Sequence, residues 1–209
     1  MELIILILWI CLSIPLIAYI FYKLVFLRDP KRKIPSGNNI ISPADGKIVS
    51  IVEINNNKIK GIKIKKGLVG KIFTSTADIA KDCYVISIFM GLLDVHVNRA
   101  PIAGKIENIK YKRGKFFPAN TLKNGLINEK NEITIKNKKL GKIKIIQIAG
   151  FLARRIECWV NKNKELIKGQ KVGRINLGSQ VTMVLPKNIK LKIKKGDKVK
   201  GGSTIIAEY

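Results

Sequence analysis

A glycine-serine pair, Gly178-Ser179, lies between two strand-like stretches in the segment RINLGSQVTMVLP. Small residues between strands are typical of a bulge or tight bend, which is the ordinary interpretation of such a pair. A serine hydroxyl can instead act as a nucleophile when a base removes its proton. The candidate base is His96, the single histidine of the chain, because imidazole titrates near neutral pH. The pattern alone leaves both alternatives open.

The other residue types argue against several kinds of site. A single histidine excludes a cluster of imidazole metal ligands. The three cysteines, Cys11, Cys83 and Cys158, lie far apart, and the sequence contains no CxxC spacing. An odd number of dispersed cysteines favours neither a disulfide framework nor a zinc site. We therefore expect no metal site.

The chain is strongly basic, with 40 Lys and Arg against 14 Asp and Glu and a net charge of +26. This excess favours an anionic partner, which could be nucleic acid, an anionic membrane surface or an acidic substrate. The alternative is a set of solvated lysines, because the sequence is rich in Ile, Lys and Asn throughout. The charge therefore indicates only that a partner would be negatively charged.

The beginning of the chain predicts a membrane anchor. Leu3 to Tyr22 are 20 consecutive uncharged, mostly apolar residues, about the length that crosses a hydrocarbon core of roughly 30 Å. Basic residues follow this segment, which argues against a cleaved signal peptide and places the rest of the chain in the cytoplasm. We expect an anchor over residues 1–27 and a basic linker over residues 28–39, which would also lie against anionic head groups. A helix buried in a soluble domain is the less favoured alternative.

From Ile40 onward the sequence predicts a mainly β domain. Short runs rich in Ile and Val alternate with period two between Gly, Asn and Lys clusters, as in GKIVSIVEI and CYVISIFM. We expect a barrel or sandwich-like arrangement. The closing segment KKGDKVKGGSTI is similar to the hammerhead hairpin of lipoyl and biotinyl domains, although no Met-Lys pair marks a carrier lysine.

Four stretches contain functional residue types that a Lys- and Ile-rich β domain does not need. They are ISPADGKIVSI (41–51), FMGLLDVHVNRAPIAGKI (89–106), QIAGFLARRI (147–156) and VGRINLGSQVTMVLP (172–186). With the apolar anchor and the LRDPKRKIP juncture, they make the chain resemble the phosphatidylserine decarboxylase proenzyme family. The resemblance is to its small, single-domain type, which includes archaetidylserine decarboxylases, and it covers nearly the whole chain.

The resemblance implies that Ser179 attacks the carbonyl of Gly178, that the chain is cut between them, and that Ser179 becomes a pyruvoyl group. A glycine permits the close approach that this attack demands. Asp94 and His96 match the family's Asp-x-His element, and Asp45 matches its conserved aspartate, which is implied to orient the imidazole in a Ser-His-Asp arrangement. The pyruvoyl ketone is implied to form a Schiff base with the substrate amine and to act as the electron sink for decarboxylation.

One position departs from the larger members of the family, which carry a second histidine where this chain has Arg99. A single His96 then serves both self-cleavage and decarboxylation, or another group takes one of these roles. Arg99, Arg154 and Arg155 are candidates for contact with the substrate head group, with a structural or solvated role equally open.

The resemblance also implies an organisation for the whole protein. We expect a catalytic β domain over residues 40–209, cut at 178/179 into a β chain (1–178) and an α chain (179–209) that remain associated as a heterodimer. The expected substrate is a serine phospholipid of the cell membrane, with no metal, no diffusible cofactor and no nucleic acid partner. The alternative function is a membrane-anchored, non-enzymatic adaptor with a lipoyl-like domain.

Overall fold

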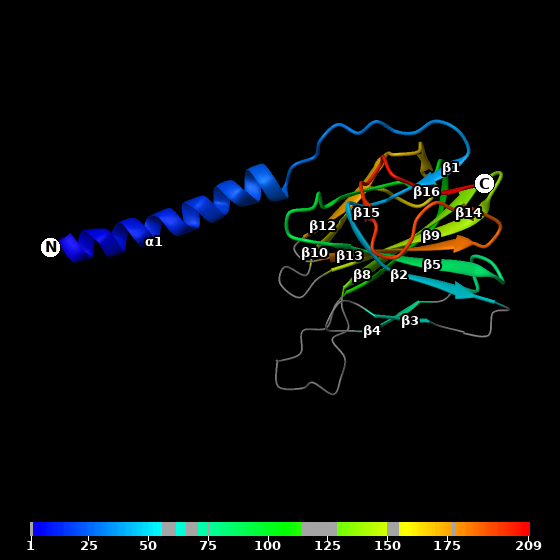
Figure 1. The fold of residues 1–209 in the computed structure, drawn as a ribbon, viewed down its shortest axis with the longest axis horizontal. Helices are drawn as coiled ribbons and strands as arrows, with labels where there is room; N and C mark the ends of the chain where they lie inside the picture. Colours follow the sequence, from blue (N-terminus) through cyan, green and yellow to red (C-terminus); the bar gives the residue numbers. More distant parts are fainter. Residues whose placement is uncertain are drawn as a thin grey trace.

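A helix and a β domain make up the part of the chain that the computed structural model describes, residues 2–55, 62–65, 71–74, 76–113, 129–149, 155–176 and 179–209. Helix α1, Glu2–Phe21, continues into a π-helical turn, η1, Tyr22–Phe26. The helix projects away from the β domain (Figure 1). The window Trp9–Phe26 is long and apolar enough to cross a membrane, and only 6% of it is buried. The predicted N-terminal apolar helix is confirmed.

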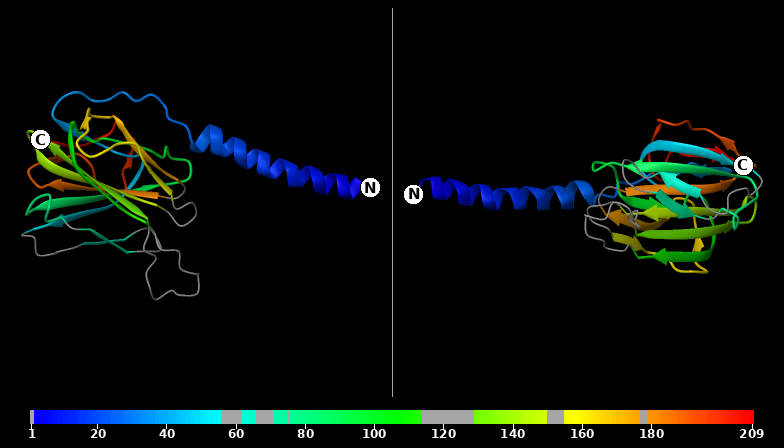
Figure 2. Two further views of the ribbon diagram at one scale, coloured as in Figure 1. Left: turned by 180° about the vertical axis from the view of Figure 1, so that it is seen from behind. Right: turned by 90° about the horizontal axis from the view of Figure 1, so that it is seen from below.

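Eight strands form one antiparallel sheet that is strongly curled (Figure 2). Their order across the sheet is β11 (Glu165–Leu166), β7 (Gly104–Lys112), β8 (Lys130–Asn137), β9 (Gly141–Ile148), β13 (Ser179–Pro186), β5 (Cys83–Met90), β2 (Gly46–Ile54) and β15 (Lys198–Val199). The prediction of a mainly β domain is confirmed, in the form of a curled antiparallel sheet.

Three smaller sheets complete the β domain in its described parts. One contains β1 (Asn39–Ile41), β16 (Ile205–Glu208) and β14 (Lys190–Leu191); a second contains β10 (Arg155–Cys158), β12 (Lys171–Asn176) and β6 (Val97–Arg99); the third is the hairpin of β3 (Ile62–Lys65) and β4 (Lys71–Thr74). The sheet of β6, β10 and β12 adjoins the residues that the sequence singled out, because β12 precedes the Gly-Ser pair and β6 follows His96.

Strand β13 has both faces covered, and all eight of its residues are buried. Val181 and Met183 contribute to the main hydrophobic core, whereas Val184 on the opposite face belongs to a second cluster. Because side chains alternate between faces along a strand, Ser179 shares the face of Val181 and points toward the main core. The Gly-Ser pair therefore introduces a central, buried strand.

The linker between the apolar helix and β1 forms no helix or strand over residues 28–38, as its Pro- and Gly-containing sequence predicted. It runs along the surface of the β domain (Figures 1 and 2). Ion pairs join it to the domain, from Asp29 to Arg99 at 2.6 Å and from Arg32 to Asp45 at 2.8 Å. These contacts hold the segment that leaves the helix against the β domain.

Candidate active site

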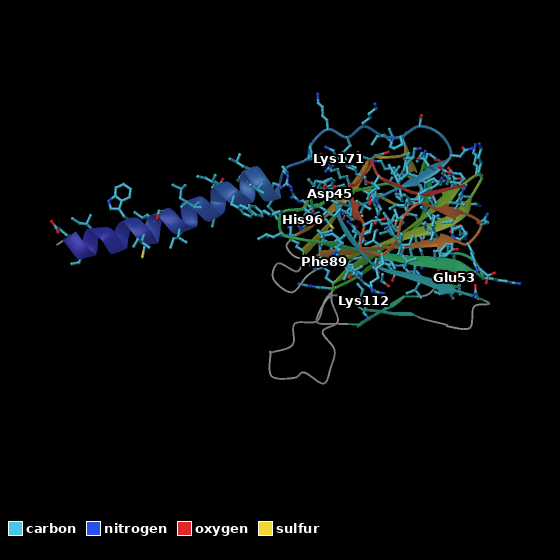
Figure 3. The ribbon with its side chains drawn as sticks, in the orientation of Figure 1. Asp45, Glu53, Phe89, His96, Lys112 and Lys171 are labelled. Atoms are coloured by element: carbon cyan, nitrogen blue, oxygen red, sulfur yellow. The ribbon has the colours of Figure 1, made fainter. Side chains whose placement is uncertain are left out.

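His96 lies in the loop between β5 and β6, at the end of the β domain from which the helix leaves (Figure 3). Asp94 shapes this loop, because its carboxylate Oδ2 accepts a hydrogen bond from the Gly91 N–H at 2.7 Å. The backbone N–H of Asp94 in turn donates to the Gly91 carbonyl at 3.1 Å. These hydrogen bonds form a turn at Asp94, and the imidazole that follows it is buried, with His96 0% exposed.

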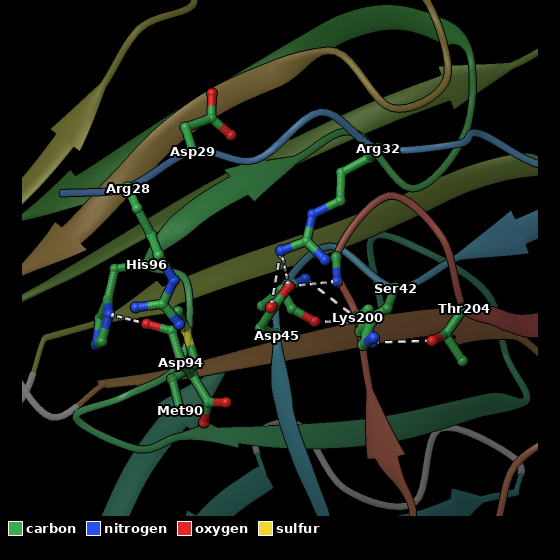
Figure 4. A network of polar contacts seen from close by, with 12 residues as sticks. Arg28, Asp29, Arg32, Ser42, Asp45, Met90, Asp94, His96, Lys200 and Thr204 are labelled. Carbon is green, nitrogen blue, oxygen red and sulfur yellow. Dashed lines mark hydrogen bonds and ion pairs between the residues drawn. The ribbon is translucent and has the colours of Figure 1, made fainter. Parts of the chain in front are cut away.

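A hydrogen bond selects the tautomer of His96. Its Nδ1 lies 2.8 Å from the backbone carbonyl oxygen of Asp94 (Figure 4). A carbonyl oxygen can only accept, so Nδ1 carries the proton and the neutral ring has its free lone pair on Nε2. Nε2 is buried and has no hydrogen-bond partner among the described residues. The ring is therefore held as a base with an unused acceptor.

Burial lowers the pKa of His96 below its ordinary value, and this effect outweighs the hydrogen bond to Asp94 and the charges of Asp94 and Asp45, which raise it. The positive charge of Arg28 lowers the pKa further. Low polarity penalises the imidazolium more than the neutral ring. At neutral pH, His96 is accordingly uncharged and ready to accept a proton.

This pKa shift predicts a pH dependence. Unfolded His96 binds a proton near pH 6.5, whereas the folded form binds it only at lower pH, so stability decreases as the pH falls below about 6.5. Self-cleavage by neutral His96 should stay on a plateau through pH 6.5 and decline only below it. Precursor cleavage followed on gels, with circular dichroism as a check on folding, measures this; a decline centred above pH 6.5 would contradict the lowered pKa.

Ser179 begins β13 and is 0% exposed. Its hydroxyl lies 3.4 Å from the thioether sulfur of Met90, the residue opposite it on β5. A thioether is a weak acceptor, so this contact leaves the hydroxyl free to transfer its proton elsewhere. Gly178 and Leu177 lie outside the described residues.

Strand pairing at both ends of the His96 loop brings His96 toward Ser179. Ser179 pairs with Met90 at the end of β5, while Arg174 on β12 pairs with Val97 on β6. The Ile175 N–H also donates to the His96 carbonyl at 3.3 Å. The loop that contains His96 is therefore held at both of its ends, at Met90 by the pairing with Ser179 and at Val97 by the pairing with Arg174. In the described contacts no hydrogen bond joins the two side chains themselves.

Asp45 lies close to this end of the domain but binds other groups. Its carboxylate accepts two hydrogen bonds from Arg32, at 3.0 and 2.8 Å, and one from the Gly201 N–H at 2.7 Å. Figure 4 shows this cluster beside the loop of His96 and Asp94. Asp45 acts on His96 through its charge, and the described contacts include no hydrogen bond between them. The role of Asp45 in a Ser-His-Asp arrangement stays a prediction.

The arginines predicted to contact substrate have different surroundings. Arg99 is 9% exposed and donates to the Gly169 carbonyl at 3.1 Å and to Asp29 at 2.6 Å. Arg155 is exposed at the start of β10. Arg154 lies outside the described residues. Substrate contact by any of the three stays a prediction, and Arg99 already has a structural partner.

The end of the N-terminal apolar helix also lies at the site, which the sequence did not indicate. Phe26 is 1% exposed, and its ring centroid lies 4.1 Å from that of His96. Tyr22 stacks on Phe26 in turn, at 5.5 Å between ring centroids. Arg28 donates to the backbone carbonyl of Leu93, in the same loop as His96. Strand and helix periodicity contains no signal for contacts that the end of a helix and the irregular segment after it make with a distant loop.

Comparison with known proteins places this sequence in a family. The family model for phosphatidylserine decarboxylase matches residues 22–207. A candidate archaetidylserine decarboxylase proenzyme from Methanocaldococcus jannaschii is 42% identical over 198 residues, which are 93% of each chain. A phosphatidylserine decarboxylase proenzyme from Desulfotalea psychrophila is 39% identical, over 90% of this chain and 79% of that protein.

These relatives span nearly the whole sequence, including the site. A phosphatidylserine decarboxylase proenzyme from Chlorobium phaeobacteroides is also 39% identical, over 92% of this chain and 81% of that protein. The matched region begins at η1 and ends inside β16, so it includes the segment from the helix end to the last strand. The chain therefore belongs to the phosphatidylserine decarboxylase family.

Proposed function

We propose that this chain is the proenzyme of a carboxy-lyase that removes carbon dioxide from the serine head group of a phospholipid, phosphatidylserine or archaetidylserine. The observation that carries the proposal is the double pairing of the His96 loop with the segment around Ser179. It brings the only imidazole of the chain toward a buried hydroxyl. Among the described residues, the imidazole Nε2 has no hydrogen-bond partner and the hydroxyl has only the Met90 sulfur.

The first reaction cuts the chain between Gly178 and Ser179. His96 accepts the Ser179 proton at Nε2 as Oγ adds to the preceding carbonyl carbon. The carbon-nitrogen bond then breaks, the amine takes up the proton, and the upstream chain is left as an ester of Ser179. Loss of the α-proton expels that chain as a carboxylate, and water replaces the nitrogen of the remaining dehydroalanine, releasing ammonia. No oxidant or reductant is needed.

The structure around Ser179 suits the resulting pyruvoyl group. The position is 0% exposed and faces the main core, and the adjoining Met90 is also 0% exposed. When formed, the group supplies a ketone that condenses with the substrate amine and withdraws electrons as carbon dioxide leaves. His96 Nε2 takes up the proton that the substrate ammonium loses when it condenses, and returns a proton to the carbon that loses the carboxylate. Phe26 excludes water from one face of the imidazole.

The protein then has three functional parts. Residues 1–27 anchor it in the membrane, residues 28–39 link the anchor to the domain, and residues 40–209 form the catalytic domain. Cleavage yields chains 1–178 and 179–209, which stay together because β13 pairs with β5 and β9. The basic residues after the anchor favour a catalytic domain on the cytoplasmic face.

The alternative function is a non-enzymatic adaptor with a lipoyl-like hammerhead in its C-terminal region. Family membership argues against it, and so do the strand pairings that bring a preoriented histidine toward a buried serine. The hammerhead likeness concerns only the turns around Gly196 and Gly202, which both have positive φ angles. It adds no function to the proposal.

Mass spectrometry of the purified protein tests the proposal. We expect two chains, residues 1–178 and a 31-residue chain that follows from 209 − 178, the latter beginning with a pyruvoyl group. Release of carbon dioxide from carboxyl-labelled phosphatidylserine in mixed micelles should accompany the cleaved form. A folded, membrane-bound protein consisting only of the uncut chain would refute self-cleavage, and a cleaved protein that releases no carbon dioxide would refute the decarboxylation.

A further inference from the structure

Three arginines lie around the point where the helix joins the domain, and they differ in whether a nearby carboxylate neutralises their charge. Arg32 forms an ion pair with Asp45, and Arg99 forms one with Asp29. Arg28 forms no ion pair with any residue in the described ranges. Among these three guanidinium groups, only that of Arg28 keeps an uncompensated positive charge.

Backbone contacts orient Arg28 without neutralising it. One terminal nitrogen donates to the Val25 carbonyl at 2.5 Å, and the other donates to the Leu93 carbonyl. Carbonyl oxygens carry no net charge, and a guanidinium has five N–H donors in a fixed planar arrangement. Several donors therefore remain for an anion, and the side chain is partly exposed. An oriented guanidinium of this kind suits the geometry of phosphate or carboxylate oxygens.

The location of Arg28 matches the depth of a lipid head group. It follows the apolar window Trp9–Phe26 by two residues, so it lies where the anchor leaves the hydrocarbon region. It is also next to the loop of His96 and Asp94 (Figure 4), close enough for its charge to act on the imidazole. A head group bound at Arg28 would accordingly present its serine to the buried site without leaving the membrane surface.

A serine phospholipid offers two anions to such a cation, and the chemistry favours the phosphate. The carboxylate loses its negative charge as carbon dioxide departs, so a cation paired with it would stabilise the substrate more than the transition state and slow the reaction. The phosphate keeps its charge throughout. A contact with phosphate therefore binds the substrate without opposing the decarboxylation.

We propose that Arg28 is the residue that binds the phosphate of the substrate head group and positions the serine beside His96. This inference rests on the proposed function. It also separates Arg28 from the other basic residues of the linker, because Lys31 and Lys33 are exposed and form no ion pair within the described part of the chain. Those lysines attract anionic lipids in general, whereas Arg28 recognises one molecule at the site.

The kinetic test compares Arg28→Gln with Lys31→Gln and Lys33→Gln, which remove the same charge from the same segment. Self-cleavage precedes substrate binding, so all three should be cleaved, and cleavage confirms folding. We expect kcat/KM for phosphatidylserine to fall roughly 10- to 100-fold in Arg28→Gln, mainly through KM, and to change by less than about 3-fold in the lysine variants. Equal losses in all three would overturn the proposal. If Arg28→Gln is not cleaved, Arg28→Lys takes its place with an intermediate loss expected.

A soluble probe distinguishes phosphate from carboxylate. Glycerophosphoethanolamine carries the phosphate but no carboxylate, and it should inhibit the native enzyme and the lysine variants at least about 10-fold more strongly than Arg28→Gln. Unchanged inhibition of Arg28→Gln would refute the phosphate contact, even if KM for phosphatidylserine had risen.

A second measurement does not depend on turnover. In the Ser179→Ala precursor, labelled with ¹⁵N-histidine, the single imidazole gives one set of resonances. Glycerophosphoethanolamine should raise the pKa of His96, because it neutralises the charge of Arg28 beside the imidazole. In a double variant that carries both Ser179→Ala and Arg28→Gln, the ligand should no longer change this pKa. The absence of any response in the Ser179→Ala precursor would count against the phosphate site. A response without decarboxylation by the native protein would instead contradict the proposed function alone.

Discussion

Replacement of Ser179 by alanine should give a single uncut chain of 209 residues that releases no carbon dioxide from phosphatidylserine. The hydroxyl oxygen is the only atom at this position that can add to the preceding carbonyl, and it also becomes the precursor of the ketone. Both reactions therefore stop completely. Intact-mass measurement and a labelled carbon dioxide assay on the same preparation check the two outcomes.

The variant should remain folded, which makes its inactivity informative. The described contact of the Ser179 hydroxyl is a weak one to the Met90 sulfur, so its loss should change the free energy of unfolding by about 1 kcal/mol or less. Ser203→Ala is the matched control, because Ser203 is a partly exposed serine in the turn before β16. It should be cleaved and active. Cleavage of the Ser179→Ala chain would show that another residue supplies the nucleophile.

The secondary structure was predictable because local patterns determine it. Twenty uncharged residues indicated α1, and period-two alternation indicated strands such as β5 and β2. The same alternation could not show that β13 has both faces buried. That burial depends on a second hydrophobic cluster, to which Ile54 and Ile148 from distant segments contribute. Pairing between strands that are far apart in the chain is a tertiary property, and a local sequence pattern does not reveal it.

The site was predictable in its residue types but less so in their contacts. The resemblance singled out Asp94, yet the structure uses its carboxylate to close a turn and its backbone carbonyl to orient His96. Asp45 was expected at the imidazole, and its described hydrogen bonds go to Arg32 and Gly201. A sequence motif indicates which residues a reaction needs. Which atom of each residue makes a contact depends on backbone geometry.

The linker was the part of the chain whose contacts were least predictable from the sequence. Its basic residues favoured a general attraction to head groups, and this interpretation treats all of them alike. The structure separates them, because Asp29 and Arg32 form ion pairs with the domain while Arg28 is held by carbonyl groups. Charge compensation in an irregular segment depends on residues more than a dozen positions away, as Arg32 and Asp45 illustrate.

Replacement of His96 by glutamine should slow self-cleavage by roughly 10²- to 10⁴-fold, the usual contribution of a general base. Glutamine has a similar length and can accept a hydrogen bond, but it cannot take up a proton at neutral pH. The half-time for disappearance of the precursor, followed at fixed pH, measures the effect. Cleavage at the native rate would show that a group other than the only imidazole removes the Ser179 proton.

A cavity variant separates the chemical role of His96 from a structural one. His96→Gly leaves a space against the Phe26 ring, and added imidazole should restore part of the cleavage with a pH dependence that follows the pKa of imidazole itself. A purely structural histidine would not be replaced in this way. The second step is tested on the His96→Gln protein after its slow cleavage has gone to completion: if His96 also supplies the proton after decarboxylation, its kcat should be lower than that of the native enzyme. An unchanged kcat would assign that proton to another group.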